Sequence, residues 1–316
     1  MNNIYLNNFS YALGSIARSA AQSEQAGDLL SSADALHDAG FKSHRICAVN
    51  ETAYELARNA LKSGPIKPSE IDCICYATCI PDNGNLPGEQ NFSDSRDVKH
   101  LMNFPASRLQ SEFEMNRAFV IGLNQQACTG MLGSIRLARN MLRSEPELNQ
   151  ALCITADRFP NGAIYEQAYN LISDGAAACT VSRQRKGFRI LAMHHITNGA
   201  MATADDDQTV GSYFNYTHQV ISETLSRARL SMSDICWVVP QNTNRKAWQI
   251  LASLLQVDEA QAWFDSIDRC GHVISADNII NLADLEASGK LSSGDKLLTF
   301  MAGFGSNWQC LILERV

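Results

Sequence analysis

The stretch AFVIGLNQQACTGMLGSIRLARNML, residues 118–142, joins a strand pattern to a helix pattern. Its first six residues, 118–123, form a short apolar run that predicts a buried strand. Apolar residues then recur at helical spacing, at Met131, Ile135, Ala138 and Leu142. Cys128 lies at the turn between the two, where the N-terminus of the helix favours a thiolate and predicts a lowered pKa. Cys128 is therefore either a nucleophile or a packed cysteine.

A plan of helix, loop and apolar strand occurs twice in the chain, at residues 51–79 and 215–242. Apolar strands that alternate with helices predict mostly parallel sheets, buried on both faces. We therefore expect an α/β fold of two similar halves, residues 1–168 with Cys128 and residues 169–316. Active sites in such folds gather at strand ends and helix N-termini.

Composition limits the classes of function. The formal net charge is −7 and there is no dense run of Lys or Arg, which argues against nucleic acid or an anionic membrane as the partner. The N-terminus has no signal-peptide pattern and no apolar run reaches membrane-spanning length. Ten cysteines in that setting indicate reduced thiols and a cytoplasmic protein. CICYATC at 73–79 favours core packing over a metal site, so we expect no metal.

The segment 80–110 interrupts this regular pattern. It is rich in Pro, Gly, Asn and Ser and is long for a connection inside a compact domain. Such loops are often lids or interfaces, and an inert surface excursion is the alternative.

Several motifs, in order along the whole chain, resemble one family. They are QQACTG (125–130), ISDGAAACTV (172–181), VVPQNTNR (238–245), RCGHVISAD (269–277) and MAGFGSNWQCLILE (301–314). Together they resemble beta-ketoacyl-acyl-carrier-protein synthase III proteins of the thiolase superfamily. The resemblance implies the thiolase fold with five αβαβα layers, a homodimer, and an acyl thioester formed on Cys128.

Two positions depart from the condensing members of that family. Those members carry a His in a P-H-x-x-N motif and an Asn in a later G-N motif, and both stabilise an enolate formed by decarboxylation. This chain has Gln241 and His272 at those places. Gln241 can donate a hydrogen bond but cannot act as a base near neutral pH. Decarboxylative condensation is therefore disfavoured.

The pattern is nearest to the acyltransferase branch of secondary metabolism, which resembles P-H-N-x-N-R followed by G-H-x-x-x-A-D with a Cys-His-Asp set. Only Gln241 departs from it. The resemblance implies that His272 is the base and Asp277 its orienter, although Asp277 also fits a helix N-cap. Either the protein relies on His272, or Gln241 replaces a histidine of the natural chain.

The implied reaction is ping-pong. The acyl donor is a thioester of coenzyme A or of phosphopantetheine on an acyl carrier protein, and no bound cofactor is needed. The backbone N–H groups of Cys128 and of the turn Gly303-Phe304-Gly305 would hold the oxyanion. Alongside Gln241, we expect Asn242, Asn244 and Arg245 to line the mouth and bind substrate.

The sequence says less about where the acyl donor binds. Lys42, His44 and Arg45 fall where family members often bind the nucleotide of coenzyme A, but the stacking tryptophan expected upstream is missing. This favours a carrier-protein donor, and a solvated basic face is the alternative.

Three functions remain open from the sequence. The first is an acyltransferase that moves an acyl group to a hydroxyl or amine in specialised-metabolite biosynthesis of the polyketide or antibiotic type. The second is a condensing enzyme that forms a carbon–carbon bond. The third is a low-activity partner subunit of a heteromeric complex, which the retained Cys128 disfavours.

Overall fold

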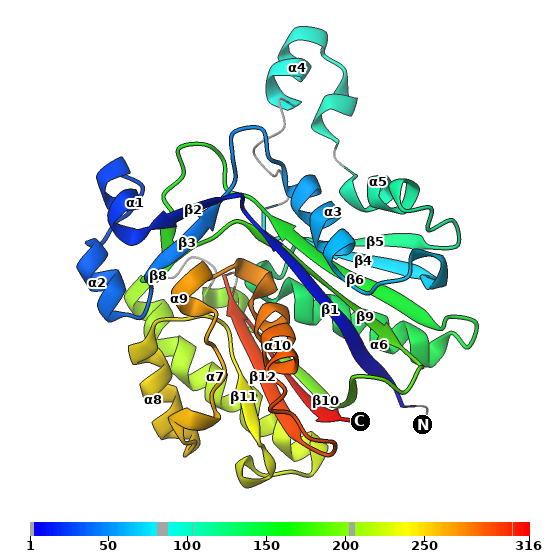
Figure 1. Cartoon of the computed structure of the whole chain (residues 1–316), viewed down its shortest axis with the longest axis vertical. Helices are drawn as coiled ribbons and strands as arrows, with labels where there is room; N and C mark the ends of the chain where they lie inside the picture. The colour runs from blue at the N-terminus through cyan, green and yellow to red at the C-terminus, as the bar shows by residue number, and fades with distance from the viewer. Residues whose placement is uncertain (1–2, 81–87, 103, 202–205, 305) are drawn as a thin grey trace.

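A nine-stranded mixed sheet runs through the computed structural model, which describes residues 3–80, 88–102, 104–201, 206–304 and 306–316 (Figure 1). The strand order is β11-β12-β13-β10-β1-β9-β6-β4-β5. These strands are β1 (Tyr5–Leu13), β4 (Cys73–Ala77), β5 (Phe119–Leu123), β6 (Gln150–Asp157), β9 (Gly175–Ser182), β10 (Phe188–Thr197), β11 (Trp237–Val239), β12 (Lys296–Gly303) and β13 (Asn307–Arg315). Two small two-stranded sheets lie beside the large sheet, β2 (Ile16–Ser19) with β3 (Ser43–Ile46) and β7 (Glu166–Gln167) with β8 (Asn170–Leu171).

The sheet has two halves that meet at β1 and β10. Their register pairs are Tyr5 with Arg189 and Leu6 with Phe188. β9 belongs to the first half because it pairs with β1 and β6. The first half therefore continues past the expected boundary at residue 168, as far as Ser182.

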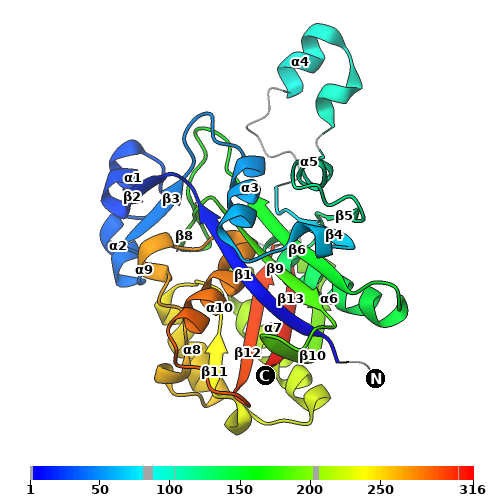
Figure 2. The ribbon, with the colours of Figure 1, turned by 45° about the vertical axis from the view of Figure 1, so that its right-hand side comes forward.

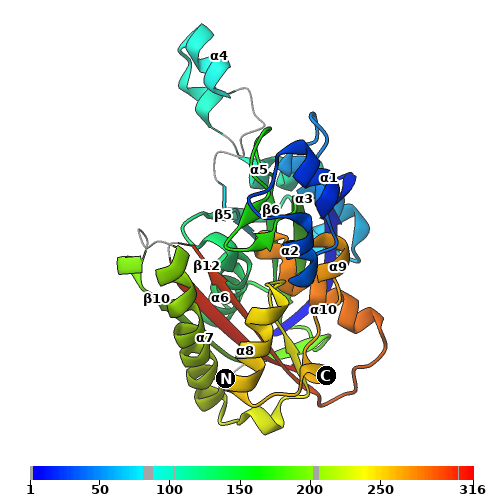
Figure 3. The same cartoon turned by 90° about the vertical axis from the view of Figure 1, so that its left-hand side faces the viewer.

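Helices form three layers around the two halves of the sheet. Figures 2 and 3 show α3 (Ala53–Ser63) and α5 (Pro105–Glu112) towards one end of the molecule and α7 (Asp206–Ala228) and α8 (Arg245–Leu255) towards the other. Between the halves lie α6 (Gly130–Ser144) and α10 (Asp277–Ala287), each of which contacts strands of both. The predicted αβαβα arrangement is confirmed.

The internal repeat is confirmed as well. Residues 51–79 contain α3, a 3-10 turn at Pro68–Glu70 and β4, and residues 215–242 contain most of α7, a 3-10 turn at Met232–Asp234 and β11. The expectation of mostly parallel strands is wrong: three pairings are parallel (β4 with β5 and β6, and β11 with β12) and the other pairings of the sheet are antiparallel. Short connections such as Gly303 to Asn307 force neighbouring strands to run in opposite directions.

The strand predicted at 118–123 exists as β5, but it is not buried. It is an edge strand, and in the single chain Phe119 is 43% and Val120 38% exposed.

Beside β5, the chain leaves the body as an arm with α4 (Gly88–Ser95) and a 3-10 turn at Val98–Leu101 (Figures 1 and 2). Part of the predicted lid or interface, residues 81–87 and 103, lies outside the described residues. None of the described helices is long and apolar enough to cross a membrane.

Candidate active site

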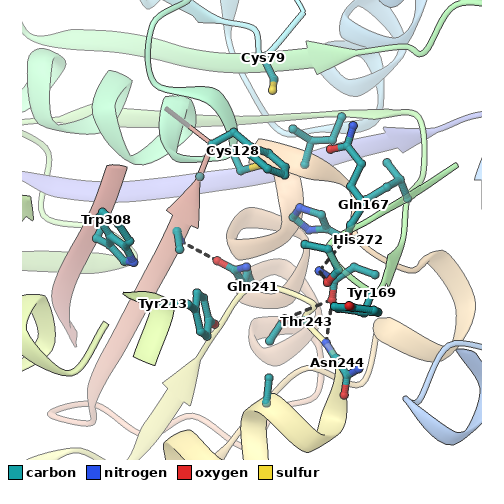
Figure 4. Close-up of a pocket in the computed structure, with 18 of the residues that line it drawn as sticks. Cys79, Cys128, Gln167, Tyr169, Tyr213, Gln241, Thr243, Asn244, His272 and Trp308 are labelled. Carbon is teal, nitrogen blue, oxygen red and sulfur yellow. Dashed lines mark hydrogen bonds between the residues drawn. The ribbon is translucent and has the colours of Figure 1, made fainter. Parts of the chain in front are cut away.

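A cavity of about 380 Å³ lies where the two halves of the molecule meet. Figure 4 shows its wall, with Cys128 contributed by the first half and His272 and Gln241 by the second. Apolar and aromatic side chains make up most of the rest, among them Ile80, Phe159, Ile172, Tyr213, Phe214, Ile250, Ile274, Phe304 and Trp308. Such a lining with a few convergent polar groups is typical of a small-molecule site.

Cys128 lies in a 3-10 turn, Ala127–Thr129, that joins β5 to α6. Ala127 has a φ of 43°, which is uncommon for a residue other than glycine, and the Ser275 hydroxyl donates to its carbonyl oxygen at 3.0 Å. Strained backbone of this kind often accompanies functional residues. Here it presents the Cys128 side chain, which is 8% exposed, to the cavity.

The expected lowering of the Cys128 pKa is wrong. A hydrogen bond with the Cys79 thiol and burial raise the pKa of the Cys128 thiol well above its usual value, and the carboxylates of Asp277 and Asp157 act in the same direction. These effects outweigh the favourable helix N-terminus. Cys128 is therefore a thiol at neutral pH and needs a base to become a nucleophile.

Cys79 is a site residue that the sequence reasoning assigned to the core. It follows the end of β4 and lines the cavity (Figure 4). Cys73 and Cys75, in contrast, are buried within the strand. Asp157 fixes its loop, since Oδ1 accepts from the backbone nitrogens of Cys79 at 2.8 Å and Ile80 at 3.1 Å. In the sequence, the sign that Cys79 belongs to the site is its position just past the end of the apolar strand.

Cys79→Ser is expected to lower the pKa of Cys128 and so to speed its alkylation several-fold near pH 8. A hydroxyl stays neutral in this range and can donate to the thiolate, which favours the charged form. The measurement is the rate of iodoacetamide labelling of Cys128 against pH, read by mass spectrometry. Cys73→Ser, within the strand, is the control. An unchanged pH profile in Cys79→Ser would contradict the contact.

His272 and Asp277 form a hydrogen-bonded pair on the cavity wall. Nδ1 of His272 lies 2.5 Å from Oδ2 of Asp277, and both side chains are buried. Oδ2 also accepts from the backbone nitrogen of Asn242 at 2.8 Å, and Oδ1 accepts from that of Val273 at 2.7 Å. Asp277 therefore holds His272 by a hydrogen bond to Nδ1. It does not cap α10, whose N-cap position is Ala276.

Backbone geometry sets the direction of His272. Gly271 has a φ of 56°, and a Cβ atom there would lie 2.5 Å from the Leu171 carbonyl oxygen. Only glycine fits so close an approach in this conformation. The His272 nitrogen donates to the same Leu171 oxygen at 2.8 Å. With Nδ1 held by Asp277, the other ring nitrogen, Nε2, remains for chemistry.

Gln241 and Gly303 complete the wall near Cys128. The Ala302 nitrogen donates to Oε1 of Gln241 at 2.6 Å, which fixes the amide and leaves its NH₂ group as a donor. Gly303 lines the cavity, and a Cβ atom there would lie 2.9 Å from the Cys128 nitrogen. Phe304 also lines the cavity, and Gly305 lies outside the described residues.

Asn242 was expected at the mouth, but the structure places it in the protein interior. It is fully buried and is not part of the cavity wall. Its Nδ2 donates to Ser266 Oγ at 2.8 Å and to the Gly271 carbonyl oxygen at 2.7 Å, and its Oδ1 accepts from Asn281 at 2.9 Å. Asn242 therefore holds the Gln241 loop against the His272 loop and does not reach a substrate.

The start of α8 corrects a second expectation. Asn244 lines the cavity as predicted, and its Oδ1 caps the helix by accepting from the Lys246 nitrogen at 2.9 Å. Arg245 points elsewhere, against Gly40 and towards Asp268 at 3.3 Å. Lys246 lines the cavity in its place and is exposed. One residue turns a helix face by about 100°, so the register could not be read without the helix start.

The basic cluster Lys42, His44 and Arg45, which falls where family members often bind a nucleotide, has mainly structural contacts. His44 is buried between the Ser23 hydroxyl at 2.7 Å and the Ile172 carbonyl oxygen at 2.6 Å, and burial lowers its pKa. Arg45 donates to the Gly14 carbonyl oxygen at 2.9 Å. Lys42 is exposed and pairs with Asp268. His44 is thus unavailable to a nucleotide, and Arg45 is half-buried with its Nε already bonded.

Known proteins resemble both halves of the chain that contribute residues to this cavity. Two profiles match, described as 3-oxoacyl-(acyl-carrier-protein) synthase III over residues 124–199 and as its C-terminal part over residues 225–315. The beta-ketoacyl-(acyl-carrier-protein) synthase III of Chlamydia caviae is 25% identical over 313 residues, covering 88% of this chain and 87% of the relative.

Solved structures agree in fold. The synthase III of Thermus thermophilus has a TM-score of 0.82 at 18% identity, covering 98% of both chains. A structure named ChlB3 and described as an acyltransferase has a TM-score of 0.80 at 19% identity, covering 99% of this chain and 98% of the other.

Proposed function

The chain belongs to the 3-oxoacyl-(acyl-carrier-protein) synthase III family, and from that premise we propose that it is an acyltransferase. It would move an acyl group from a coenzyme A or carrier-protein thioester, through Cys128, to a hydroxyl or amine acceptor. The observation that carries the proposal is the His272–Asp277 pair in one cavity with Cys128, while Gln241 replaces the histidine of the condensing members.

The first half-reaction would load the acyl group. Nε2 of His272 takes the proton of Cys128 as the sulfur attacks the thioester carbonyl, and the Asp277 carboxylate stabilises the resulting imidazolium. We expect the backbone N–H of Cys128, whose nitrogen lies beside Gly303, to donate to the oxyanion. Collapse expels the donor thiolate, which takes a proton from His272. The raised pKa of Cys128 supports this requirement for a base.

The second half-reaction would release the acyl group to the acceptor. His272 removes a proton from the hydroxyl or amine as that group attacks the carbonyl of the acyl-enzyme. The tetrahedral intermediate then expels the Cys128 sulfur, which regains a proton from His272. Gln241 can only donate a hydrogen bond, and the family's asparagine donor is missing. The paired donors for an enolate are thus absent, and acyl transfer is favoured over decarboxylative condensation.

Lys246 supports the assignment of the acyl donor to this class. An exposed ammonium group on the cavity wall suits the phosphate of a phosphopantetheine arm, whether it belongs to coenzyme A or to an acyl carrier protein. We place the reaction in specialised-metabolite biosynthesis, as the resemblance to the acyltransferase branch suggests.

The test offers a panel of acyl thioesters, on coenzyme A and on carrier proteins, and measures the intact protein by mass spectrometry. We expect a mass gain of one whole acyl group, absent from Cys128→Ala, and its loss when an alcohol or amine acceptor is added. Malonyl retained with its carboxylate would support transfer. Carbon dioxide release with formation of a ketoacyl product would establish the condensing alternative. No adduct from any donor would leave the partner-subunit alternative.

We also propose that two copies pair along β5. This edge strand exposes Phe119 and Val120, and an exposed apolar edge strand invites pairing with another chain. The arm beside it exposes Val98, Met102 and Phe104 as well.

Val120→Asp is expected to convert the dimer to a monomer, because two copies of the charge would meet at the symmetric strand pair. Light scattering after size exclusion measures the mass. Ile16→Asp, an exposed apolar position on β2, is the matched control and should leave the dimer intact. A monomeric parent protein at micromolar concentration would refute the pairing.

A further inference from the structure

Two side chains of the second half hold the turn that carries Cys128. Ser275 is buried, and its hydroxyl donates to the Ala127 carbonyl oxygen at 3.0 Å. Gln309 of β13 is also buried, and its Nε2 donates to the Thr129 carbonyl oxygen at 3.2 Å. The residue on each side of Cys128 in the sequence is therefore bonded to the opposite half of the molecule.

Gln309 makes a second contact with the same turn. Its Nε2 also donates to Oε1 of Gln126 at 2.9 Å. Gly133 of α6 leaves the space for this side chain, because a Cβ atom there would lie 1.7 Å from the same oxygen. Within the turn, the Thr129 nitrogen and hydroxyl donate to the Gln126 carbonyl oxygen at 2.9 Å and 2.7 Å. We therefore expect the turn to move as one unit, held by β13.

Backbone strain lies at both ends of the Ser275 contact. Ala127 has a φ of 43° and Ile274 a φ of 49°. Such values are uncommon for residues other than glycine, and a β-branched residue is a genuine outlier there. Strained conformations persist only where the surrounding structure holds them. Ser275 follows Ile274 directly and bonds to Ala127, so one hydroxyl serves both strained residues.

The Ser275 contact also fixes the direction of an N–H group. The Ala127 carbonyl and the Cys128 N–H belong to one trans peptide unit, in which the two groups point in opposite directions. With its oxygen held at Ser275, this unit directs the N–H away from Ser275. The Cys128 nitrogen lies beside Gly303 of the cavity wall, where a Cβ atom would be 2.9 Å from it.

We propose that Ser275 and Gln309 are positioning residues that aim the Cys128 backbone N–H at the oxyanion formed during acylation. Ser275 sets the plane of the peptide unit before Cys128, and Gln309 keeps the turn from rotating. Neither is among the described residues that line the cavity, so each acts through the turn. The inference rests on the proposed function in one respect, that the Cys128 sulfur takes an acyl group through a tetrahedral intermediate.

The experiment compares two reactions of the Cys128 sulfur, acetylation by p-nitrophenyl acetate and alkylation by iodoacetamide. In acetylation the sulfur bonds to the carbonyl carbon, the carbonyl oxygen becomes an oxyanion, and p-nitrophenolate leaves as the carbonyl forms again. In alkylation the sulfur displaces iodide and no oxyanion forms. Both reactions use the same sulfur, so a changed pKa of Cys128 would alter both rates alike.

Ser275→Ala is expected to slow acetylation by about tenfold or more and to leave alkylation within about twofold, because only acetylation uses the oxyanion donor. Gln309→Met, of similar size but without the donor, should show the same selective loss. Peptide mass spectrometry measures both rates at Cys128. If Ser275→Ala does not fold, Gln309→Met alone decides.

Thr224→Val is the matched control. Its hydroxyl is also buried and donates to a backbone oxygen, that of Val220 at 2.5 Å, but it lies in α7. Both rates should stay unchanged. Equal slowing of the two reactions in the folded variants, or acetylation as fast as in the unchanged protein, would overturn the inference. So would an unchanged protein whose Cys128 is not acetylated.

Failure of the proposed function would appear in a different measurement. It would show as an absence of loading from every coenzyme A or carrier-protein thioester, or as no transfer to an alcohol or amine. The activated ester needs neither a recognised donor nor an acceptor, so the comparison of the two rates would stand.

Discussion

His272→Ala is expected to slow acyl transfer at neutral pH by about a thousandfold, within the range typical of a lost general base. Hydrogen bonding to Cys79 and burial raise the pKa of Cys128, so very little thiolate exists without that base. The rate in the variant should therefore rise steadily as pH increases, because the thiol then ionises on its own. The measurement is the single-turnover rate of acylation from pH 6 to pH 10.

His218→Ala supplies the control for this change, because His218 is exposed on α7 away from the cavity. It should acylate at the rate of the unchanged protein. A His272→Ala variant that loads at the same neutral rate, with the same pH dependence, would show that another group removes the proton.

Asp277→Asn is expected to reduce acyl transfer about as strongly and also to destabilise the fold. The carboxylate accepts hydrogen bonds from His272, Asn242 and Val273. An amide can accept at one oxygen only and points its own N–H groups at donors. The histidine tautomer is then no longer fixed, and a buried donor left unpaired lowers the free energy of unfolding by about 1–3 kcal/mol.

Both effects of Asp277→Asn are measurable in one preparation, as the single-turnover rate and the midpoint of urea unfolding. Asp284→Asn is the matched control, since Asp284 lies on the same helix and pairs with Arg269 near the surface. Its acylation rate should not change. If Asp277→Asn loses stability but keeps its rate, Asp277 is only a structural residue.

The sequence was sufficient for the layers of the fold and for the principal pair of the site. Apolar periodicity located α6, and the repeated plan located α3, β4, α7 and β11. It failed for β5, whose apolar residues suggested burial although the strand lies at an edge. Apolar patterning records that a surface avoids water but does not tell whether the same chain or a second one covers it.

The errors within the site have a common physical origin. Asn242 and Asn244 are two residues apart, yet one is bonded on all sides in the interior and the other faces the cavity. Cys79 and Cys128 are far apart in the chain, and the hydrogen bond between their thiols acts together with burial to raise the pKa of Cys128. Such effects depend on three-dimensional neighbours that residue type and spacing do not specify.

The proposed nucleophile, Cys128, and its proposed base, His272, come from different halves of the molecule, and among the described residues the strands of those halves meet at two register pairs, Tyr5 with Arg189 and Leu6 with Phe188. In the proposed reaction, attachment and release of the acyl group thus both need one residue from each half, the sulfur of Cys128 and the base His272. Changes in the Gln241 loop can alter what else the second half offers the acyl group while the strand, turn and helix around Cys128 stay as they are. A duplicated architecture of this kind gives evolution a part to alter and a part to leave alone.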